Sequence, residues 1–173
     1  VDDCTAVVPD TASPRVKRPP RDPTNMTLLV PFDGSDLARA ALERAVEFSE
    51  YTGQDVLALS VLPDDADYAV ERGWIDEGES YDPAAVADRF ERQVTEIAPA
   101  ATFRAERPAD VSSMADVTTD VVRTIREVSH EIEASIVFIG SENAGRVSTP
   151  VCSVGAPISE DPEYDVHIVR HAA

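Results

Sequence analysis

The residues best placed to do chemistry come directly after a short apolar segment. Residues 28–30, Leu-Leu-Val, read as a buried strand, and the next five, 31–35, are Pro-Phe-Asp-Gly-Ser. Proline ends a strand ladder and Asp-Gly favours a tight turn, after which Ser35 or Asp36 can cap a helix. The carboxylate of Asp33 therefore stands at the carboxyl end of a strand, where open α/β sheets bind their ligands. We expect a binding site here; a turn contact between Asp33 and its own backbone is the alternative.

Groups suited to catalysis are sparse. His130 falls in a predicted helix, His167 in a predicted strand and His171 at the end, and none has a triad-like partner in the sequence. The sequence also lacks metal-ligand spacing, a Walker loop and a G-x-S-x-G segment. The acidic segment 64–82 is predicted to be a solvated run of charge rather than a cation site. We therefore expect no defined reaction, and a protein that is not an enzyme.

The charge balance excludes several kinds of partner. The chain has 33 acidic against 15 basic residues, a net charge of −18, and Lys17 is its one lysine. Such a surface repels nucleic acid and anionic membranes, and no apolar run approaches the roughly 20 residues of a membrane span. An acidic, lysine-poor composition is typical of a high-salt cytoplasm. We expect a haloarchaeal-type, halophilic and cytoplasmic protein with no nucleic-acid or membrane partner; an ordinary acidic protein is the alternative.

Residues 1–25 differ from the rest of the chain. They hold five prolines and four basic residues between 15 and 21, without a periodic apolar pattern. This composition is typical of a disordered leader, and a mis-assigned start is also open because Met26 directly precedes the first strand. We expect one domain over 26–173, with a functional tail as the alternative reading of the leader.

Apolar periodicity predicts the elements that position these residues. Strands are expected at 28–30, 56–62, 101–106, 135–139 and 166–169, and helices at 36–51, 82–97 and 117–132. The stretch 64–81 is expected to be a long loop with one helical turn around Ala69. Strands that alternate with helices predict an α/β fold, a five-stranded parallel Rossmann-like sheet with helices on both faces.

Four motifs carry a family resemblance. They are V-P-x-D-G-S after the first strand, L-S-V-L-P closing the second, I-V-F-I-G in the fourth and V-H-I-V-R in the fifth. Over 27–63 and 132–170 the chain resembles the universal stress protein family. The resemblance implies the strand order 3-2-1-4-5. It also implies a homodimer that pairs through the fifth strand, 166–169, at the sheet edge.

One branch of that family binds ATP through a loop, G-x2-G-x9-G-[ST], after the fourth strand. Its glycines let the backbone approach the phosphates, and its hydroxyl opens a helix. Gly140 matches the first glycine, but Asn143 stands at the second and Cys152 at the third, while Ser153 and Val154 keep the last two positions. We therefore predict that ATP binding is weak or absent.

The half of the site for base and ribose is better preserved. The resemblance implies that Asp33 contacts the ligand and that the backbone of Val61 contacts adenine. The candidate binding residues, including those that flank these two and those of the loop, are Pro31, Phe32, Asp33, Val61, Gly140, Asn143, Ser153 and Val154.

Three hypotheses remain for the function. The first is a universal stress protein, a small cytosolic stress-response binding or signalling module with a degraded nucleotide loop. The second is an ATP- or adenine-nucleotide-binding member with slow hydrolysis. This hypothesis would be supported if Gly145 and Gly155 supplied the loop glycines in a shifted register, or if Arg146 contacted a phosphate. The third is an interaction protein whose cleft is filled by side chains. Copurification of a nucleotide would separate them.

Overall fold

The computed structural model describes residues 26–108, 117–141, 158–159 and 161–172. The leader 1–25 lies outside these residues, as does most of the connection after the fourth strand, which contains Asn143, Ser153 and Val154. The expectations for those positions therefore stay predictions.

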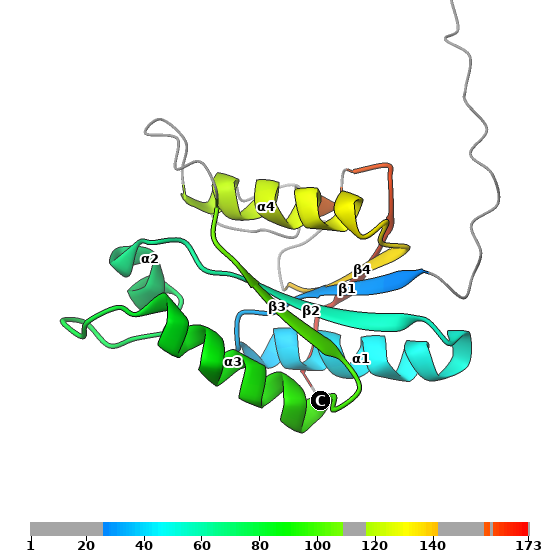
Figure 1. Ribbon diagram of the computed structural model, residues 1–173, viewed down its shortest axis with the longest axis horizontal. Helices are drawn as coiled ribbons and strands as arrows, with labels where there is room; N and C mark the ends of the chain where they lie inside the picture. The colour runs from blue at the N-terminus through cyan, green and yellow to red at the C-terminus, as the bar shows by residue number, and fades with distance from the viewer. Residues whose placement is uncertain (1–25, 109–116, 142–157, 160, 173) are drawn as a thin grey trace, which may run out of the picture.

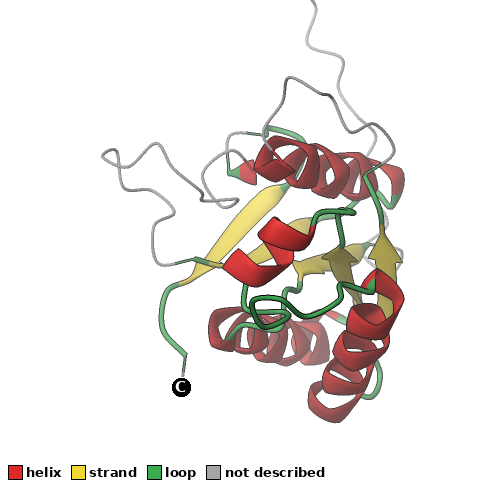
Figure 2. Ribbon diagram, turned by 90° about the vertical axis from the view of Figure 1, so that its left-hand side faces the viewer, coloured by secondary structure: helices red, strands yellow, loops and turns green. Residues whose placement is uncertain are grey.

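Five parallel strands form one sheet in the order β3-β2-β1-β4-β5. Helices α1 and α3 cover one face and α4 covers the other, as Figures 1 and 2 show. This arrangement confirms the predicted α/β fold and its strand order. The strands are β1 (Thr27–Pro31), β2 (Asp55–Val61), β3 (Thr102–Glu106), β4 (Ile136–Gly140) and β5 (Asp165–Val169); the helices are α1 (Asp36–Thr52), α2 (Ala66–Glu71), α3 (Pro83–Ile97) and α4 (Val117–Glu131).

The central strands form the core because both of their faces are covered. The three middle residues of β1 are buried, and so is every residue of β2 after Asp55. A parallel strand with helices on both faces is expected to read as a continuous apolar run. Residues 56–62 could therefore be predicted as a buried strand from the sequence. The observed strand begins one residue earlier and ends one residue earlier than predicted.

Local signals set the ends of α1 as predicted. The Ser35 side chain accepts a hydrogen bond from the Ala38 N–H at 3.2 Å, and Ser35 is the N-terminal cap. Gly53 ends the helix in the left-handed region, with φ 70°, and its N–H donates to the Ser49 carbonyl at 2.8 Å. The carboxyl end of β1 is therefore joined rigidly to a helix that begins within five residues.

The segment between β2 and α3 is more ordered than the predicted loop. It contains α2, capped by the Asp65 side chain, which accepts from the Tyr68 N–H at 2.8 Å. Its acidic residues are largely exposed, as expected, but Tyr68 and Trp74 are buried. Helix α2 lies where one helical turn was predicted around Ala69 and extends it to six residues. The burial of Tyr68 and Trp74 was not predicted, because six residues with few apolar positions show no readable period.

The two edge strands are β3 and β5, as predicted. The β3 edge carries Arg104, which pairs with Glu106 and with Glu131 of α4. In the part of the chain that the structure describes, no helix is long and apolar enough to cross a membrane.

Candidate functional site at the carboxyl ends of β1 and β2

The turn after β1 places Asp33 at the end of the sheet. The Ser35 N–H donates to Oδ1 of Asp33 at 3.0 Å, which is the backbone contact considered as the alternative role of this residue. Gly34 has φ +79°, and a Cβ on it would lie 2.5 Å from the ring of Phe90. Asp33 is half-buried. Since a carboxylate accepts several hydrogen bonds, the turn contact leaves acceptor capacity for a ligand.

The backbone of Val61 faces the same region. The Leu59 carbonyl accepts from the Phe32 N–H at 2.8 Å, which points it toward β1, whereas the Leu62 N–H donates to Glu106 at 2.8 Å, toward β3. Because alternate residues of a strand direct their backbone groups to the same side, Val61 points its N–H and carbonyl toward β1. Strand β1 ends two residues earlier in the register, so these groups face the turn that holds Asp33.

Phe32 contributes its backbone rather than its ring to this end of the sheet. Its side chain is 2% exposed and packs edge-on against Phe90, with ring centroids 5.8 Å apart. The fully buried hydroxyl of Ser60 donates to the Phe32 carbonyl at 2.6 Å. Ser60 therefore ties the first turn to β2. Sequence reasoning missed this link, although a serine inside an apolar strand is a visible signal.

Gly140 ends β4 against the first turn of α1. A Cβ at this position would lie 2.3 Å from the Leu37 carbonyl oxygen and 2.8 Å from the Ala38 nitrogen. Glycine is thus required for the close approach of strand and helix, whether or not a ligand uses its backbone. The approach brings the end of β4 beside the start of α1, next to the Asp33 turn.

The segment 64–82 covers this end of the sheet, and Figure 2 shows α2 in front of the strand ends. Its Trp74 indole N–H donates to the Asp33 carbonyl and its Tyr81 hydroxyl to the Pro63 carbonyl, both at 3.0 Å. Burial, with a contribution from Asp64, raises the pKa of Tyr81 to about 12. Neither of these two contacts was predicted from the sequence; the signal for the first was a lone tryptophan in an acidic stretch.

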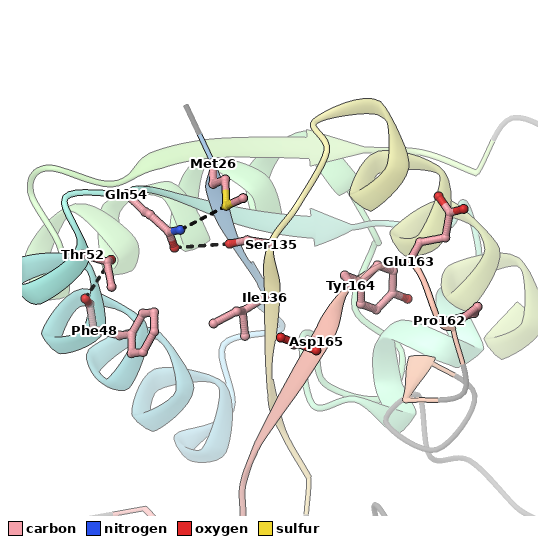
Figure 3. A pocket seen from close by; sticks show the side chains of 10 residues that line it. All are labelled: Met26, Phe48, Thr52, Gln54, Ser135, Ile136, Pro162, Glu163, Tyr164 and Asp165. Carbon is pink, nitrogen blue, oxygen red and sulfur yellow. Dashed lines mark hydrogen bonds between the residues drawn. The ribbon is translucent and has the colours of Figure 1, made fainter. Parts of the chain in front are cut away.

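A separate cavity of about 360 Å³ lies at the opposite end of the sheet, near the amino ends of β1, β4 and β5 (Figure 3). Within it, Ser135 donates to the Gln54 side-chain oxygen at 3.2 Å, and the Gln54 amide reaches the Met26 sulfur at 3.5 Å. No predicted binding residue lines this cavity. Its lining comprises Met26, Phe48, Thr52, Gln54, Ser135, Ile136, Pro162, Glu163, Tyr164 and Asp165.

The described residues offer no site for a metal. No group of three or more His, Cys, Asp or Glu side chains among them is arranged to hold an ion. The His130 ring lies 3.0 Å from the Asp161 carboxylate and 3.8 Å from that of Glu163, and these contacts link α4 to the segment before β5.

Comparisons with known proteins agree with this architecture. A family model described as the universal stress protein family matches residues 24–170. No curated protein matches the chain. Among solved structures, a universal stress protein in complex with cAMP is 17% identical with a TM-score of 0.56, and the match covers 87% of this chain and 99% of that one.

Two structures from Archaeoglobus fulgidus are also similar. A universal stress protein of strain DSM 4304 is 20% identical with a TM-score of 0.56, over 86% of this chain but 45% of that one. A universal stress protein in complex with dAMP is 16% identical with a TM-score of 0.50, over 83% of this chain and 96% of that one. At these identities the likeness shows the fold.

Proposed function

The chain belongs to the universal stress protein family, and we propose that it is a stress-response binding module that takes an adenine nucleoside or mononucleotide. One observation carries the proposal: the half-buried Asp33 lies on the turn after β1, and the backbone of Val61, at the end of the paired strand β2, is directed to the same side. Such strand ends are where α/β sheets bind ligands. Two similar structures, of universal stress proteins in complex with cAMP and with dAMP, support this ligand class.

A ligand with few phosphates suits this end of the sheet better than ATP. Asn143 and Cys152 replace two glycines that would let the backbone approach phosphates. Carboxylates at 33, 36 and 64 add negative charge next to the strand ends. Each further phosphate therefore raises the electrostatic cost of binding, although high salt screens part of it.

Isothermal titration calorimetry in high salt tests the proposal with adenosine, cAMP, AMP and ATP. We expect measurable binding of the first three, weaker binding of ATP, and a loss of roughly tenfold or more in Asp33→Ala. The exposed Asp67→Ala is the matched control, because it removes a carboxylate from α2 without touching the turn. Submicromolar ATP affinity would contradict the phosphate argument, and no binding of any ligand would favour an interaction protein.

We also propose a homodimer through β5, and the geometry now selects the residue to test. The Asp165 N–H donates to Ser135 and the Val169 carbonyl accepts from Ser141, so the odd-numbered residues face β4. The N–H of Ile168 therefore points outward, to the free edge. Ile168→Pro should give a folded monomer in light scattering. Val169→Pro should instead weaken pairing with β4 and lower stability, and a dimeric Ile168→Pro would refute this interface.

The acidic excess motivates two related proposals, a cytoplasmic location and a dependence of folding on high salt. At about 1 M salt the Debye length is about 3 Å, so the charges of the compact state hardly repel one another. Lowering KCl from about 1 M to about 0.05 M should reduce the free energy of unfolding markedly. A flat profile would identify an ordinary acidic protein.

The domain is proposed to begin at Met26, where the periodic sequence starts. A chain lacking residues 1–25 should keep its melting temperature in high salt. A decrease of many degrees would show that the leader packs on the domain.

A further inference from the structure

The indole N–H of Trp74 makes a hydrogen bond directed at a candidate ligand-binding residue. It donates at 3.0 Å to the carbonyl oxygen of Asp33, 41 residues earlier. Trp74 is 5% exposed and is the single tryptophan of the chain. The bond therefore joins the β1 turn to a segment that no strand pairing connects to it.

The Trp74 side chain is itself held firmly. Its ring meets those of Tyr68 and Phe90 edge-on, with centroids 5.5 Å and 5.8 Å away. Its backbone N–H donates to the Ala69 carbonyl and its carbonyl accepts from the Arg89 guanidinium, both at 2.8 Å. A side chain fixed by α2 on one side and α3 on the other makes a rigid donor, and a rigid donor limits the directions its acceptor can take.

Other bonds also hold the Asp33 turn, since the Ser60 hydroxyl donates to the Phe32 carbonyl and the Ser35 N–H to the Asp33 carboxylate, but the bond to the Asp33 carbonyl comes from Trp74. Gly34, with φ +79°, gives the backbone here its conformational freedom, and the ring of Phe90 closes the space above it. The direction of the Asp33 carbonyl sets the peptide plane between residues 33 and 34. A rotation of that plane would also displace the Ser35 N–H from the Asp33 carboxylate.

We propose that Trp74 is the positioning residue of the Asp33 turn, so that the segment 64–82 determines how the Asp33 carboxylate is presented to a ligand. The ligand part of this inference rests on the proposed function, whereas the positioning part concerns the free protein. Trp74 is not itself a ligand contact. Packing alone would be satisfied by another aromatic ring, but the directed bond to Asp33 requires the indole N–H.

The chain supplies a matched control for this bond. Tyr81 belongs to the same segment and donates a hydrogen bond of the same length, 3.0 Å, to the Pro63 carbonyl after β2. Trp74→Phe and Tyr81→Phe each keep an aromatic ring and each remove one donor. Trp74→Phe removes the donor to the Asp33 carbonyl, whereas Tyr81→Phe removes the donor to the Pro63 carbonyl. An effect on Asp33 that appears only in Trp74→Phe is therefore due to the loss of the indole donor.

Amide hydrogen exchange of the free protein in high salt is the first measurement. Trp74→Phe should speed exchange of the Ser35 amide roughly five- to tenfold, as expected for the loss of one hydrogen bond, and leave the Leu62 amide unchanged. Tyr81→Phe should leave Ser35 unchanged. Equal Ser35 exchange in wild type and Trp74→Phe would overturn the proposal.

The affinity for cAMP is the second measurement. Trp74→Phe should bind roughly tenfold more weakly and Tyr81→Phe as the wild type does. If the wild type binds AMP or adenosine but not cAMP, the same comparison is made with the ligand that binds. If it binds none of the three, the proposed function fails, while the exchange experiment still decides the positioning role. Equal affinity in wild type and Trp74→Phe would overturn the ligand part.

If Trp74→Phe does not fold, the wild type itself supplies the answer. The indole N–H gives one assignable NMR signal because the chain has a single tryptophan. Strong protection of this N–H from exchange supports the bond to Asp33. Exchange at the rate of a free indole would overturn it.

Discussion

The two ends of the sheet are built differently. At the carboxyl end, three side chains from β2 and the segment 64–82 donate to backbone carbonyls of Phe32, Asp33 and Pro63. At the amino end, side chains line an open cavity of about 360 Å³, and Gln54 meets Ser135 and Met26 through side-chain contacts. The carboxyl end is thus organised before a ligand arrives, whereas the side-chain bonds to backbone carbonyls at the amino end, from Ser49 to Gln54 at 2.6 Å and from Ser135 to Thr27 at 3.4 Å, border an open cavity.

This difference indicates which end suits recognition of a defined ligand. Preorganised backbone and carboxylate groups bind with less loss of conformational entropy than groups that must first be ordered. The cavity at the amino end is therefore not the stronger candidate. Substitutions at the carboxyl end should cost more stability than similar substitutions at the amino end.

The largest effect is expected for Gly140→Ala. Its Cβ would overlap the backbone of Leu37, which cannot move without displacing α1, so we expect a loss of about 3 kcal/mol or more. Gly73→Ala is the control: φ is +68° there but nothing lies within 4 Å of the added Cβ, and about 1 kcal/mol is expected. Denaturant unfolding measures both. Similar losses would show that β4 and α1 adjust freely.

The next comparison removes one serine hydroxyl from each end. Ser60 is fully buried and its loss would leave the Phe32 carbonyl without this donor, so Ser60→Ala should cost about 2 kcal/mol. Ser135 is half-buried beside the cavity, where water can replace the hydroxyl, and Ser135→Ala should cost about 0.5 kcal/mol. A reversed order would refute the contrast between the two ends.

Both ends should respond alike to alkaline pH. Burial raises the pKa of Tyr81 at one end and of Tyr164 at the other to about 12. The unfolded phenol ionises near about 10, so the folded state holds these protons more tightly. The stability that these two phenols contribute is fully present below about pH 10 and is lost as the pH rises through about 12.

Urea midpoints measured at about pH 9 and about pH 11 check this. Tyr81→Phe and Tyr164→Phe should each lessen the alkaline loss, and the double variant should lessen it further. A double variant with the wild-type pH profile would contradict the assignment to these two phenols.

A small effect is also expected for Gln54→Ala at the amino end. Its side chain makes a long contact to a sulfur at 3.5 Å and one to a hydroxyl at 3.2 Å, so we expect a loss below about 1 kcal/mol. The free energy of unfolding from denaturant titration measures it. A loss as large as that of Ser60→Ala would show that the amino end is also organised by directed bonds.

The sequence by itself determined the order and type of the strands and long helices, and narrowed the cap of the first helix to Ser35 or Asp36, of which the structure shows Ser35. These features depend on neighbours within a few residues, because apolar periodicity and backbone preferences act locally. The Asp33 turn was predictable for the same reason. The family motifs then supplied the strand order, which local patterns alone do not specify.

Only the tertiary structure decided which distant groups meet. Trp74 reaches Asp33 across 41 positions and Ser60 reaches Phe32 across 28, contacts that no local pattern encodes. The packing role of Gly140 and the outward direction of Ile168 likewise depend on a neighbouring helix and strand. A hydrogen bond needs its donor and acceptor about 3 Å apart, and that proximity arises only when the sheet is assembled.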